Sequence, residues 1–315
     1  MITVVGSLNM DLVINAKKIP RPGETVMGKS FKQIPGGKGG NQADAAAKLG
    51  ALVCMIGCVG DDAMGALLKS SLKADGVNVD SVLVKAEAAT GVAAIIVEDS
   101  GDNAITVAPG ANYALTVEDI EGQRAVIEKS AILLLQLETT METVKASLKI
   151  AKSAGTITIL NPAPAAELDA EILSYIDILT PNETELEFLT GQKTETLAHI
   201  ESAGKFLLKQ GVKELVVTLG KNGCMHITKD GAKHYMAYKV KAVDTTAAGD
   251  SFTAALAVSL SAGQTMEDAI KFAGKVGAMT VTKEGAQTSL PLQKEVEGFD
   301  DWLNAQHNIK EEEKQ

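Results

Sequence analysis

The sequence has no long apolar run, no excess of basic residues and only three cysteines. A membrane-spanning helix needs about eighteen consecutive apolar residues, and no segment approaches that length, so we expect no membrane partner. The net charge of −10 at pH 7 argues against nucleic acid as a partner, because phosphate backbones bind basic surfaces. The N-terminus enters an apolar stretch without a basic leader, which predicts no signal peptide.

The cysteines Cys54, Cys58 and Cys224 are an odd number, which does not favour a disulfide framework. Cys54 and Cys58 lie in or beside the apolar stretch 52–56 with no His nearby, so we interpret them as packing residues. Reduced thiols are typical of the cytoplasm, where we expect the protein. With 315 residues, 45% of them hydrophobic, the chain can bury one large core with a small appendage.

Short apolar runs alternate with amphipathic helical patterns along most of the chain. The runs are 132–135, 157–160, 176–179 and 215–218, and the helical patterns are 141–154, 166–174 and 198–210. This alternation predicts an α/β fold, with a mostly parallel sheet covered by helices on both faces. Ligands of such sheets bind beyond the carboxyl ends of the strands. By this count Asp11, Glu138, Asn161, Asn182, Thr218 and Asp244 all lie at that edge.

Two segments depart from the alternation. Residues 12–34 contain strand-like pieces without a helix, and residues 90–108 read as a hairpin that turns at 99–102. A few strands with one apolar face are not stable alone in water, so they must cover something. We predict a single domain, 1–315, with an inserted β lid formed by about 12–34 and 90–108.

The segment 244–253 carries the strongest chemical signal. We predict that a strand over 238–243 ends, that small residues form a turn, and that a helix begins near Gly249 and closes at Gly263. Free N–H groups at a helix start bind anions, and small side chains let a phosphate approach them. Asp250 would then face an incoming hydroxyl and accept its proton. The alternative is an ordinary helix cap.

A glycine-rich segment, 36–42, precedes an Ala-rich helix over 43–49. It has neither the spacing of a Walker loop nor that of a dinucleotide fingerprint. Backbone amides, the ammonium of Lys38 and the amide of Asn41 suit a sugar or its phosphate. A glycine-rich turn without a ligand is the alternative.

The two segments, with other motifs in the same order, resemble the ribokinase family of carbohydrate kinases over nearly the whole chain. The further motifs are Asn9-Met10-Asp11, Gln136-Leu137-Glu138, 161–164, 180–185, 218–223 and 282–287. The chain departs from the family at Gly40, where Ala is usual, and at Thr253, where Asn is common. Gly40 would loosen the sugar loop, whereas Thr253 affects only a peripheral contact.

The resemblance implies ATP-dependent phosphorylation of D-ribose at its 5-hydroxyl, giving ribose 5-phosphate and ADP. A kinase for 2-deoxyribose, another pentose or a nucleoside is the first alternative, and a non-catalytic sugar sensor is the second. The sensor is disfavoured because it would be expected to have lost Asp250 or the glycine-rich loops. The family also implies that the lid pairs with a second copy to form a homodimer.

The resemblance further implies the residue roles. Asp250 is the expected base, and the amides of Ala247, Ala248, Gly249 and Asp250 are the expected anion site. The expected sugar contacts are Asn9, Met10, Asp11, Gly37, Lys38, Gly39, Gly40, Asn41, Glu138 and Asp250. A carboxylate such as Asp11 suits a vicinal diol because it accepts two hydrogen bonds.

ATP, Mg²⁺ and K⁺ are the implied cofactors. The expected nucleotide and Mg²⁺ contacts are Asn182, Glu185, Thr218, Leu219, Gly220, Lys221, Asn222, Gly223, Gly249, Asp250 and Gly274. The expected K⁺ ligands, mostly through the main chain, are Asp244, Thr246, Thr280, Lys283, Gly285 and Ser289. Two alternatives stay open: Asn182 caps a helix over 183–189, and Asp244 caps its own turn through the amides of Thr245 or Thr246.

Overall fold

The structure is a computed structural model that describes the backbone of residues 1–312 and the side chains of residues 1–305. The main sheet has nine strands in the order β13-β12-β11-β10-β9-β8-β1-β4-β5. Their bounds are β1 Ile2–Val5, β4 Val53–Gly60, β5 Val82–Lys85, β8 Ile132–Leu135, β9 Ile157–Leu160, β10 Ile178–Leu179, β11 Glu214–Thr218, β12 Cys224–Thr228 and β13 Gly231–Tyr235. From β11 to β5 neighbouring strands are parallel, and β12 and β13 continue antiparallel at one edge. The predicted α/β class is confirmed.

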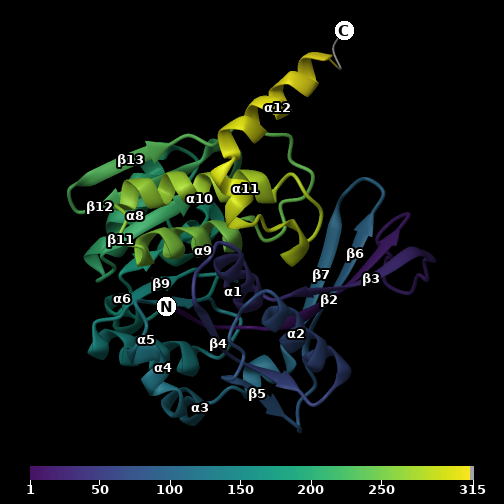
Figure 1. Cartoon of the computed structure of the whole chain (residues 1–315), viewed down its shortest axis with the longest axis horizontal. Helices are drawn as coiled ribbons and strands as arrows, with labels where there is room; N and C mark the ends of the chain where they lie inside the picture. The colour runs from purple at the N-terminus through teal and green to yellow at the C-terminus, as the bar shows by residue number, and fades with distance from the viewer. Residues whose placement is uncertain (313–315) are drawn as a thin grey trace.

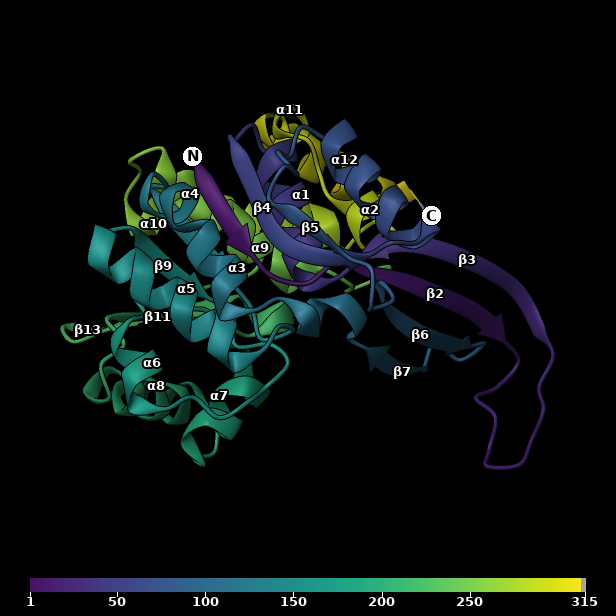
Figure 2. The same cartoon turned by 90° about the horizontal axis from the view of Figure 1, so that it is seen from below.

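Helices cover both faces of this sheet (Figures 1 and 2). They are α1 Lys38–Lys48, α2 Ala63–Ala74, α3 Val117–Gly122, α4 Arg124–Glu128, α5 Met141–Ala154, α6 Ala170–Ser174, α7 Glu183–Thr190, α8 Leu197–Lys209, α9 Ala248–Ser261, α10 Met266–Thr280, α11 Gln293–Glu297 and α12 Phe299–Glu312. Successive strand residues point to opposite faces. Val4 accordingly joins the core under α1, α2 and α9 to α12, and Val5 joins the core under α3 to α8.

A second, four-stranded sheet projects to one side of the body, as Figure 2 shows. Its order is β3-β2-β6-β7, with β2 Asn9–Ala16, β3 Gly28–Gly36, β6 Gly91–Glu98 and β7 Asn103–Ala108. β2 runs antiparallel to β3 and parallel to β6, and the predicted hairpin turn at 99–102 joins β6 to β7. β2 begins before the predicted segment 12–34, and β3 ends after it. The reason is that Asn9 already pairs with Gly91 of β6 and with Gly36 of β3.

The strand predicted over 238–243 was wrong. β13 ends at Tyr235, and the chain then crosses the molecule without forming a strand. Its end is held by the amides of Val243 and Asp244, which both donate to the carbonyl of Val281, at 2.7 and 3.2 Å. The apolar residues that suggested a strand do not all enter the core, since Val243 is 58% exposed.

The helix predicted over 43–49 begins earlier, at Lys38, and β3 runs up to Gly36. Two glycines make this junction possible. Gly37 has φ +84, and a Cβ there would lie 2.7 Å from the amide nitrogen of Asn9. A Cβ at Gly39 would lie 2.6 Å from the nitrogen of Ser7, so α1 packs directly on the chain that follows β1. The glycine-rich loop is therefore mostly a helix start.

The observed bounds of α6 and β10 also differ from the prediction, since α6 begins at Ala170 and β10 at Ile178. The three cysteines are free and buried, as the packing interpretation predicts. Among the described residues, no helix combines the length and apolarity needed to cross a membrane.

Candidate active site

Asp250 lies in the first turn of α9, and this helix begins directly after a strained residue, Ala247. Ala247 has φ +58 and is the single non-glycine residue with positive φ among those described. A left-handed conformation costs a residue such as Ala roughly 1–2 kcal/mol, and such strain concentrates at functional sites. Apart from its chain neighbours and the backbone of its own helix, an ideal Cβ at Gly249 would meet no atom of the described chain within 4 Å. The small residue is thus not explained by packing, and the turn leaves room for an anion at the helix start.

Two amide side chains orient the carboxylate of Asp250, which is only 6% exposed. Asn41 Nδ2 donates to its Oδ2 at 3.0 Å and Gln42 Nε2 to its Oδ1 at 3.1 Å. Gln136 Nε2 in turn donates to Gln42 Oε1 at 2.6 Å, which fixes the direction of the Gln42 amide. Burial raises the pKa of Asp250, against the charge of Lys38 and these two donors. A raised pKa suits a proton acceptor working near neutral pH.

Asp11 and Glu138 bring two further carboxylates to the same place. Glu138 follows β8 and accepts from the hydroxyl of Ser7 and from the amide nitrogen of Lys38, the latter at 3.1 Å. Burial, followed by the negative charges of Glu138 and Asp250, raises the pKa of Asp11 to about 7. Asp11 therefore faces the catalytic candidate from the small sheet.

Lys38 is the cation at the centre of these acids. Burial alone would favour its neutral form, but Asp250, Glu138, Glu185 and Asp11 together raise its pKa. A single ammonium among four carboxylates neutralises only part of their charge. Such a site favours hydroxyl groups and cation-bound phosphates over free anions.

Asn9 is positioned by Asn112, a residue that the sequence analysis missed. Asn112 Nδ2 donates to Asn9 Oδ1 at 2.7 Å, and the amide of Leu8 donates to Asn112 Oδ1 at 2.8 Å. This arrangement leaves Asn9 Nδ2 directed toward Glu138 Oε2, at 3.5 Å. Asn112 is 1% exposed and lies in a 3-10 turn, Gly110–Ala114, that carries no motif spacing. Ser7, Gln42 and Gln136 were also given no role, although the last two lie within the motifs.

Other predicted sugar residues differ in what they offer. Asn41 Oδ1 is buried and has no hydrogen-bond partner among the described residues, so it is available to a hydroxyl. The Met10 side chain is 0% exposed in the core, which leaves only its main chain for a ligand. Gly40 lies in α1, and its amide donates to the carbonyl of Ser7, outside that helix, at 2.8 Å. It therefore belongs to a helix and does not loosen a loop. Thr253 is buried, and its hydroxyl lies 3.2 Å from that of Thr180.

Asn182 and Glu185 form a complete capping box at the start of α7. Asn182 Oδ1 accepts from the Glu185 amide at 2.8 Å, and the two oxygens of Glu185 accept from the amide nitrogen and Nδ2 of Asn182, both at 2.9 Å. The helix-cap alternative is therefore realised. Burial raises the pKa of Glu185, the charge of Lys38 opposes this rise, and the charge of Asp250 adds to it, so Glu185 lies within electrostatic range of Asp250.

The segment 218–223 forms a tight corner after β11. Thr218, the last residue of β11, donates its amide to the carbonyl of Pro181 at 2.9 Å, and it forms an isolated parallel bridge with Asn182. The Leu219 amide donates to the carbonyl of Gly223 at 2.8 Å and closes the turn around Gly220–Asn222, which includes the exposed Lys221. Gly274 lies in α10 beside the Tyr238 ring.

Asp244 fastens the turn before α9 to a second loop. Its Oδ1 accepts from the amide and hydroxyl of Thr246 at 2.9 and 2.6 Å, and its Oδ2 accepts from the amide of Gly285 at 2.9 Å. Although burial acts in the other direction, these donors lower the pKa of Asp244. The turn-cap alternative is present, and so is the predicted neighbourhood of Asp244 and the 280–289 region.

The remaining predicted cation ligands are distributed around that region. Thr280 Oγ1 donates to Ser251 Oγ at 3.0 Å, and Ser289 Oγ donates to the carbonyl of Ala286 at 2.7 Å. Lys283 Nζ pairs with Glu295 at 3.0 Å, so only its carbonyl is offered to an ion.

The predicted edge of the sheet is partly correct. Glu138, Asn161, Asn182 and Thr218 lie at or directly after the carboxyl ends of β8, β9, β10 and β11. The placement of Asp11 at the end of the first strand was wrong, because β1 ends at Val5 and Asp11 lies inside β2. Asp244 follows no strand either. Both residues reach the site from outside the main sheet.

Comparison with known proteins places the chain in a family. A model of the pfkB family of carbohydrate kinases matches residues 1–293, and the chain belongs to this family. Ribokinase from Haemophilus influenzae is 39% identical over 298 residues, which cover 95% of this chain and 97% of that protein. Deoxyribokinase from Salmonella typhimurium is 38% identical over 304 residues, with coverages of 96% and 98%.

A solved structure shares the whole fold. Ribokinase from Arabidopsis thaliana, complexed with ribose and ATP, superposes with a TM-score of 0.89 at 34% identity, covering 95% of this chain and 97% of that one. The resemblance predicted from the motifs is thus confirmed.

Proposed function

We propose that this protein transfers the γ-phosphoryl group of ATP to the 5-hydroxyl of D-ribose, giving ribose 5-phosphate and ADP. The observation that carries the proposal is the buried Asp250 carboxylate, held by Asn41 and Gln42 beside the open helix start at Gly249. Relatives named ribokinase, at 39% and 42% identity, support ribose as the sugar.

Asp250 acts as the base in this reaction. Its carboxylate accepts the proton of the 5-hydroxyl while that oxygen attacks the γ-phosphorus and the bond to the leaving ADP oxygen breaks. Charge on the transferring group is stabilised by the amides from Ala247 to Asp250, at the positive end of the α9 dipole. Asp11, Asn9 and Glu138 hold the sugar hydroxyls so that the reacting one faces Asp250.

The nucleotide is assigned to the neighbouring corner formed by the α7 start and the turn at 218–223. Relatives solved with ATP or ADP support this cofactor. Mg²⁺ bound with ATP neutralises phosphate charge and keeps much of its water shell. Glu185 and Asn182 fit the role of contacting such waters, because an ionised carboxylate has about four acceptor positions and the capping box occupies two of them.

A kinase for 2-deoxyribose is the second candidate, favoured by the deoxyribokinase relative at 38% identity. Loss of the 2-hydroxyl would leave an acceptor of Asp11 unpaired in a buried site, which disfavours that sugar. A coupled ADP-release assay with ribose, 2-deoxyribose, other pentoses, hexoses and nucleosides separates the candidates. Ribose should give the highest kcat/KM. A higher value for 2-deoxyribose would favour the second candidate, and no ADP release with any sugar would favour a sensor.

We also propose that K⁺ binds beside Asp244, with carbonyls of Thr246, Thr280, Lys283 and Gly285 and the hydroxyl of Ser289. Asp244 uses three hydrogen bonds and keeps acceptor capacity, and its lowered pKa keeps it charged. A cation there would stabilise the turn that precedes the anion site without touching substrate.

Activity should therefore rise when Na⁺ is replaced by K⁺ at constant ionic strength, because the larger ion suits a site of many carbonyl oxygens. The measurement is a titration of K⁺ against choline with Mg²⁺ saturating. Asp244→Ala should abolish the response. A flat response in the parent enzyme would reject the ion site, while the assignments of base and anion site would stand.

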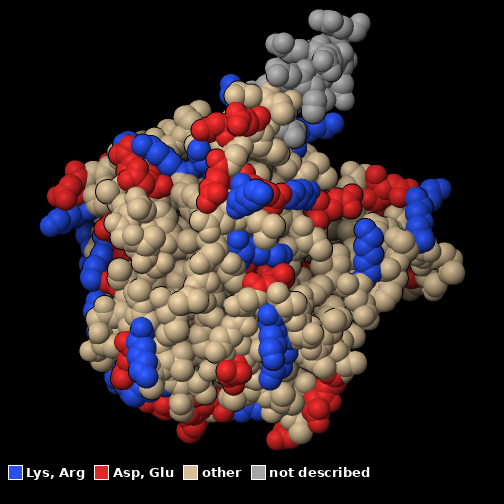
Figure 3. Space-filling view, in the orientation of Figure 1, with Lys and Arg blue, Asp and Glu red and all other residues tan. Residues whose placement is uncertain are grey.

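The small sheet supports a further proposal, a homodimer formed through this sheet. Strand register places Ile14 and Phe31 on one face, at 39% and 57% exposure, and Ile105 and Val107 on the other, at 55% and 45%. A projecting sheet with exposed apolar side chains is stabilised when another copy covers it. By contrast, positive and negative side chains are interspersed over the face that Figure 3 shows.

Phe31→Glu should convert a dimer into monomers, because a C2 interface places the introduced charge twice at one contact. The measurement is sedimentation velocity over a range of concentrations. Phe188→Glu is the matched control, since Phe188 lies on α7 and is 52% exposed. A monomeric parent, or a dimer that survives Phe31→Glu, would contradict this interface.

We assign the protein to the cytoplasm. The support is the three buried free thiols, of which Cys58 and Cys224 have pKa values raised by burial to about 12. Fractionation of the source cells, with immunodetection of the protein, tests the assignment.

A further inference from the structure

The loop over residues 281–289 is fastened to the turn before α9 and approaches the small sheet. The carbonyl of Val281 accepts from the amides of Val243 and Asp244, and the Gly285 amide donates to Asp244 Oδ2 at 2.9 Å. On its other side the loop approaches the small sheet, where Lys32 Nζ lies 3.8 Å from Glu284. The 281–289 loop therefore borders both the turn before α9 and the sheet that carries Asp11.

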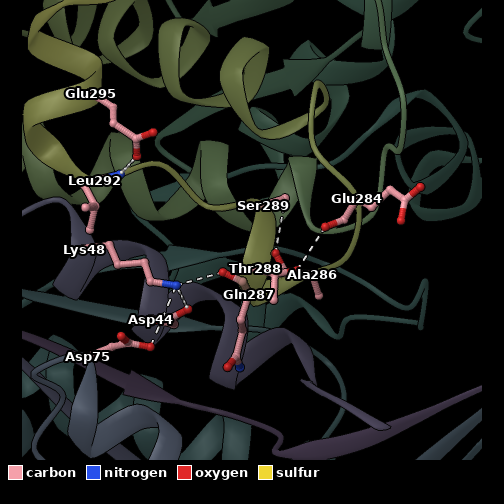
Figure 4. A network of polar contacts seen from close by, with 10 residues as sticks. All are labelled: Asp44, Lys48, Asp75, Glu284, Ala286, Gln287, Thr288, Ser289, Leu292 and Glu295. Carbon is pink, nitrogen blue, oxygen red and sulfur yellow. Dashed lines mark hydrogen bonds and ion pairs between the residues drawn. The ribbon is translucent and has the colours of Figure 1, made fainter. Parts of the chain in front are cut away.

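Lys48, the last residue of α1, holds the far end of this loop. Figure 4 shows its ammonium between α1, the end of α2 and the loop. Nζ donates to the carbonyl of Gln287 at 2.8 Å and to Asp44 Oδ2 at 2.8 Å, and it lies 3.8 Å from Asp75 Oδ2. Asp44 is completely buried and the Lys48 side chain is 15% exposed. The same helix carries Lys38, Asn41 and Gln42 into the site at its other end.

We propose that Lys48 is a positioning residue for phosphoryl transfer: it fastens α1 to the 281–289 loop and so keeps the turn at Asp244 seated beside the helix that holds Asp250. The inference rests on the proposed function, because it takes the start of α9 as the phosphoryl site. Lys48 touches neither substrate nor the reacting atoms.

The backbone of Gln287 makes this contact important. The residue is 4% exposed, and its side-chain nitrogen and oxygen have no hydrogen-bond partners among the described residues. Its carbonyl bond to Lys48 is thus the polar contact that joins this position to α1. A hydrogen bond from a charged donor is stronger than one between neutral groups, and it is shielded here from water.

Asp44 pairs with the ammonium of Lys48. Burial raises its pKa to about 7 and Lys48 opposes that rise, so the carboxylate is costly without its partner. Removing Lys48 alone would leave an unpaired buried acid and destabilise the fold for reasons unrelated to catalysis. The test therefore removes both charges together.

The primary variant is the double substitution Asp44→Asn with Lys48→Met. It leaves no unpaired buried charge but takes the donor away from the Gln287 carbonyl. We expect kcat to fall roughly ten- to a hundredfold, since misplacement of about 1 Å far from the chemistry has effects of that size. The KM values for ribose and ATP should change far less, because the groups that bind them remain.

Two companion variants control for stability and charge. Lys48→Arg retains a charged donor and should recover most of kcat, with the Tm of each variant measured in parallel. Lys145→Met removes a lysine that also pairs with two carboxylates, Asp169 and Glu171, on the surface, and it should leave kcat unchanged.

Parental kcat in a double variant assayed well below its Tm would overturn the proposal. Equal increases in both KM values with unchanged kcat would also overturn it, since they would indicate a binding role. Failure of the proposed function itself is distinguishable, because the parent would then release no ADP with any sugar in the panel.

Discussion

Asp250→Asn should lower kcat on the order of 10²–10⁴-fold, the usual contribution of a general base, while the protein stays folded and binds ATP. The substitution keeps the shape of the side chain but removes its ability to accept the hydroxyl proton. Steady-state kinetics with ribose and ATP measure the change, and isothermal titration with ATP measures nucleotide binding. A kcat within a few-fold of the parent would show that another group is the base.

The fold should tolerate this change because the surroundings can adapt. The new amide NH₂ would oppose one of the donors, Asn41 or Gln42. Asn41 can rotate its amide and present Oδ1 instead, since that oxygen has no partner among the described residues. The substitution also removes a buried carboxylate whose pKa is raised by burial. A thermal melt that matches the parent is the control.

The sequence correctly predicted the position of Asp250 at a helix start, because the signal there is local. A turn of small residues followed by an apolar helix places Asp250 and the amides of α9 within a few positions of one another. Glu138, Asn182 and Thr218 were also placed correctly, since parallel strands bring their carboxyl ends to one edge. In each case one regular element determined the position of the residue.

Prediction failed where position depends on two segments that are distant in the chain. Asp11 was placed on the main sheet, one residue before the predicted lid, but the pairing of its strand with β3 and β6 already starts at Asn9, and no local pattern marks that boundary. Asn112 and Lys48 act through contacts that span 103 and 239 positions, so their spacing carries no information. The start of α1 was missed because glycine is a poor helix former, although it is needed there for close packing.

A second prediction concerns Asp11 in the sugar site, whose carboxylate lies over the backbone of Gly36. Asp11→Ala should raise the KM for ribose roughly 10²–10⁴-fold, because two hydrogen bonds to a charged acceptor are worth about 1.5–3 kcal/mol each. The same substitution should weaken the binding of 2-deoxyribose by one hydrogen bond less, because this sugar lacks the 2-hydroxyl. The preference of the enzyme for ribose over 2-deoxyribose should therefore become smaller. The affinity for ATP should stay close to that of the parent.

The pH dependence provides an independent check of the same residue. Burial and the neighbouring acids Glu138 and Asp250 raise the pKa of Asp11 to about 7, so near neutral pH the carboxyl is only partly ionised. The diol binds the ionised form, and kcat/KM for ribose should therefore rise as pH increases through about 7 and then level off. Asp11→Asn keeps the shape without the titration and should lose this part of the rise, retaining only the part that Asp250 contributes. Unchanged discrimination between the two sugars in Asp11→Ala, with the same pH profile in Asp11→Asn, would remove Asp11 from the sugar site.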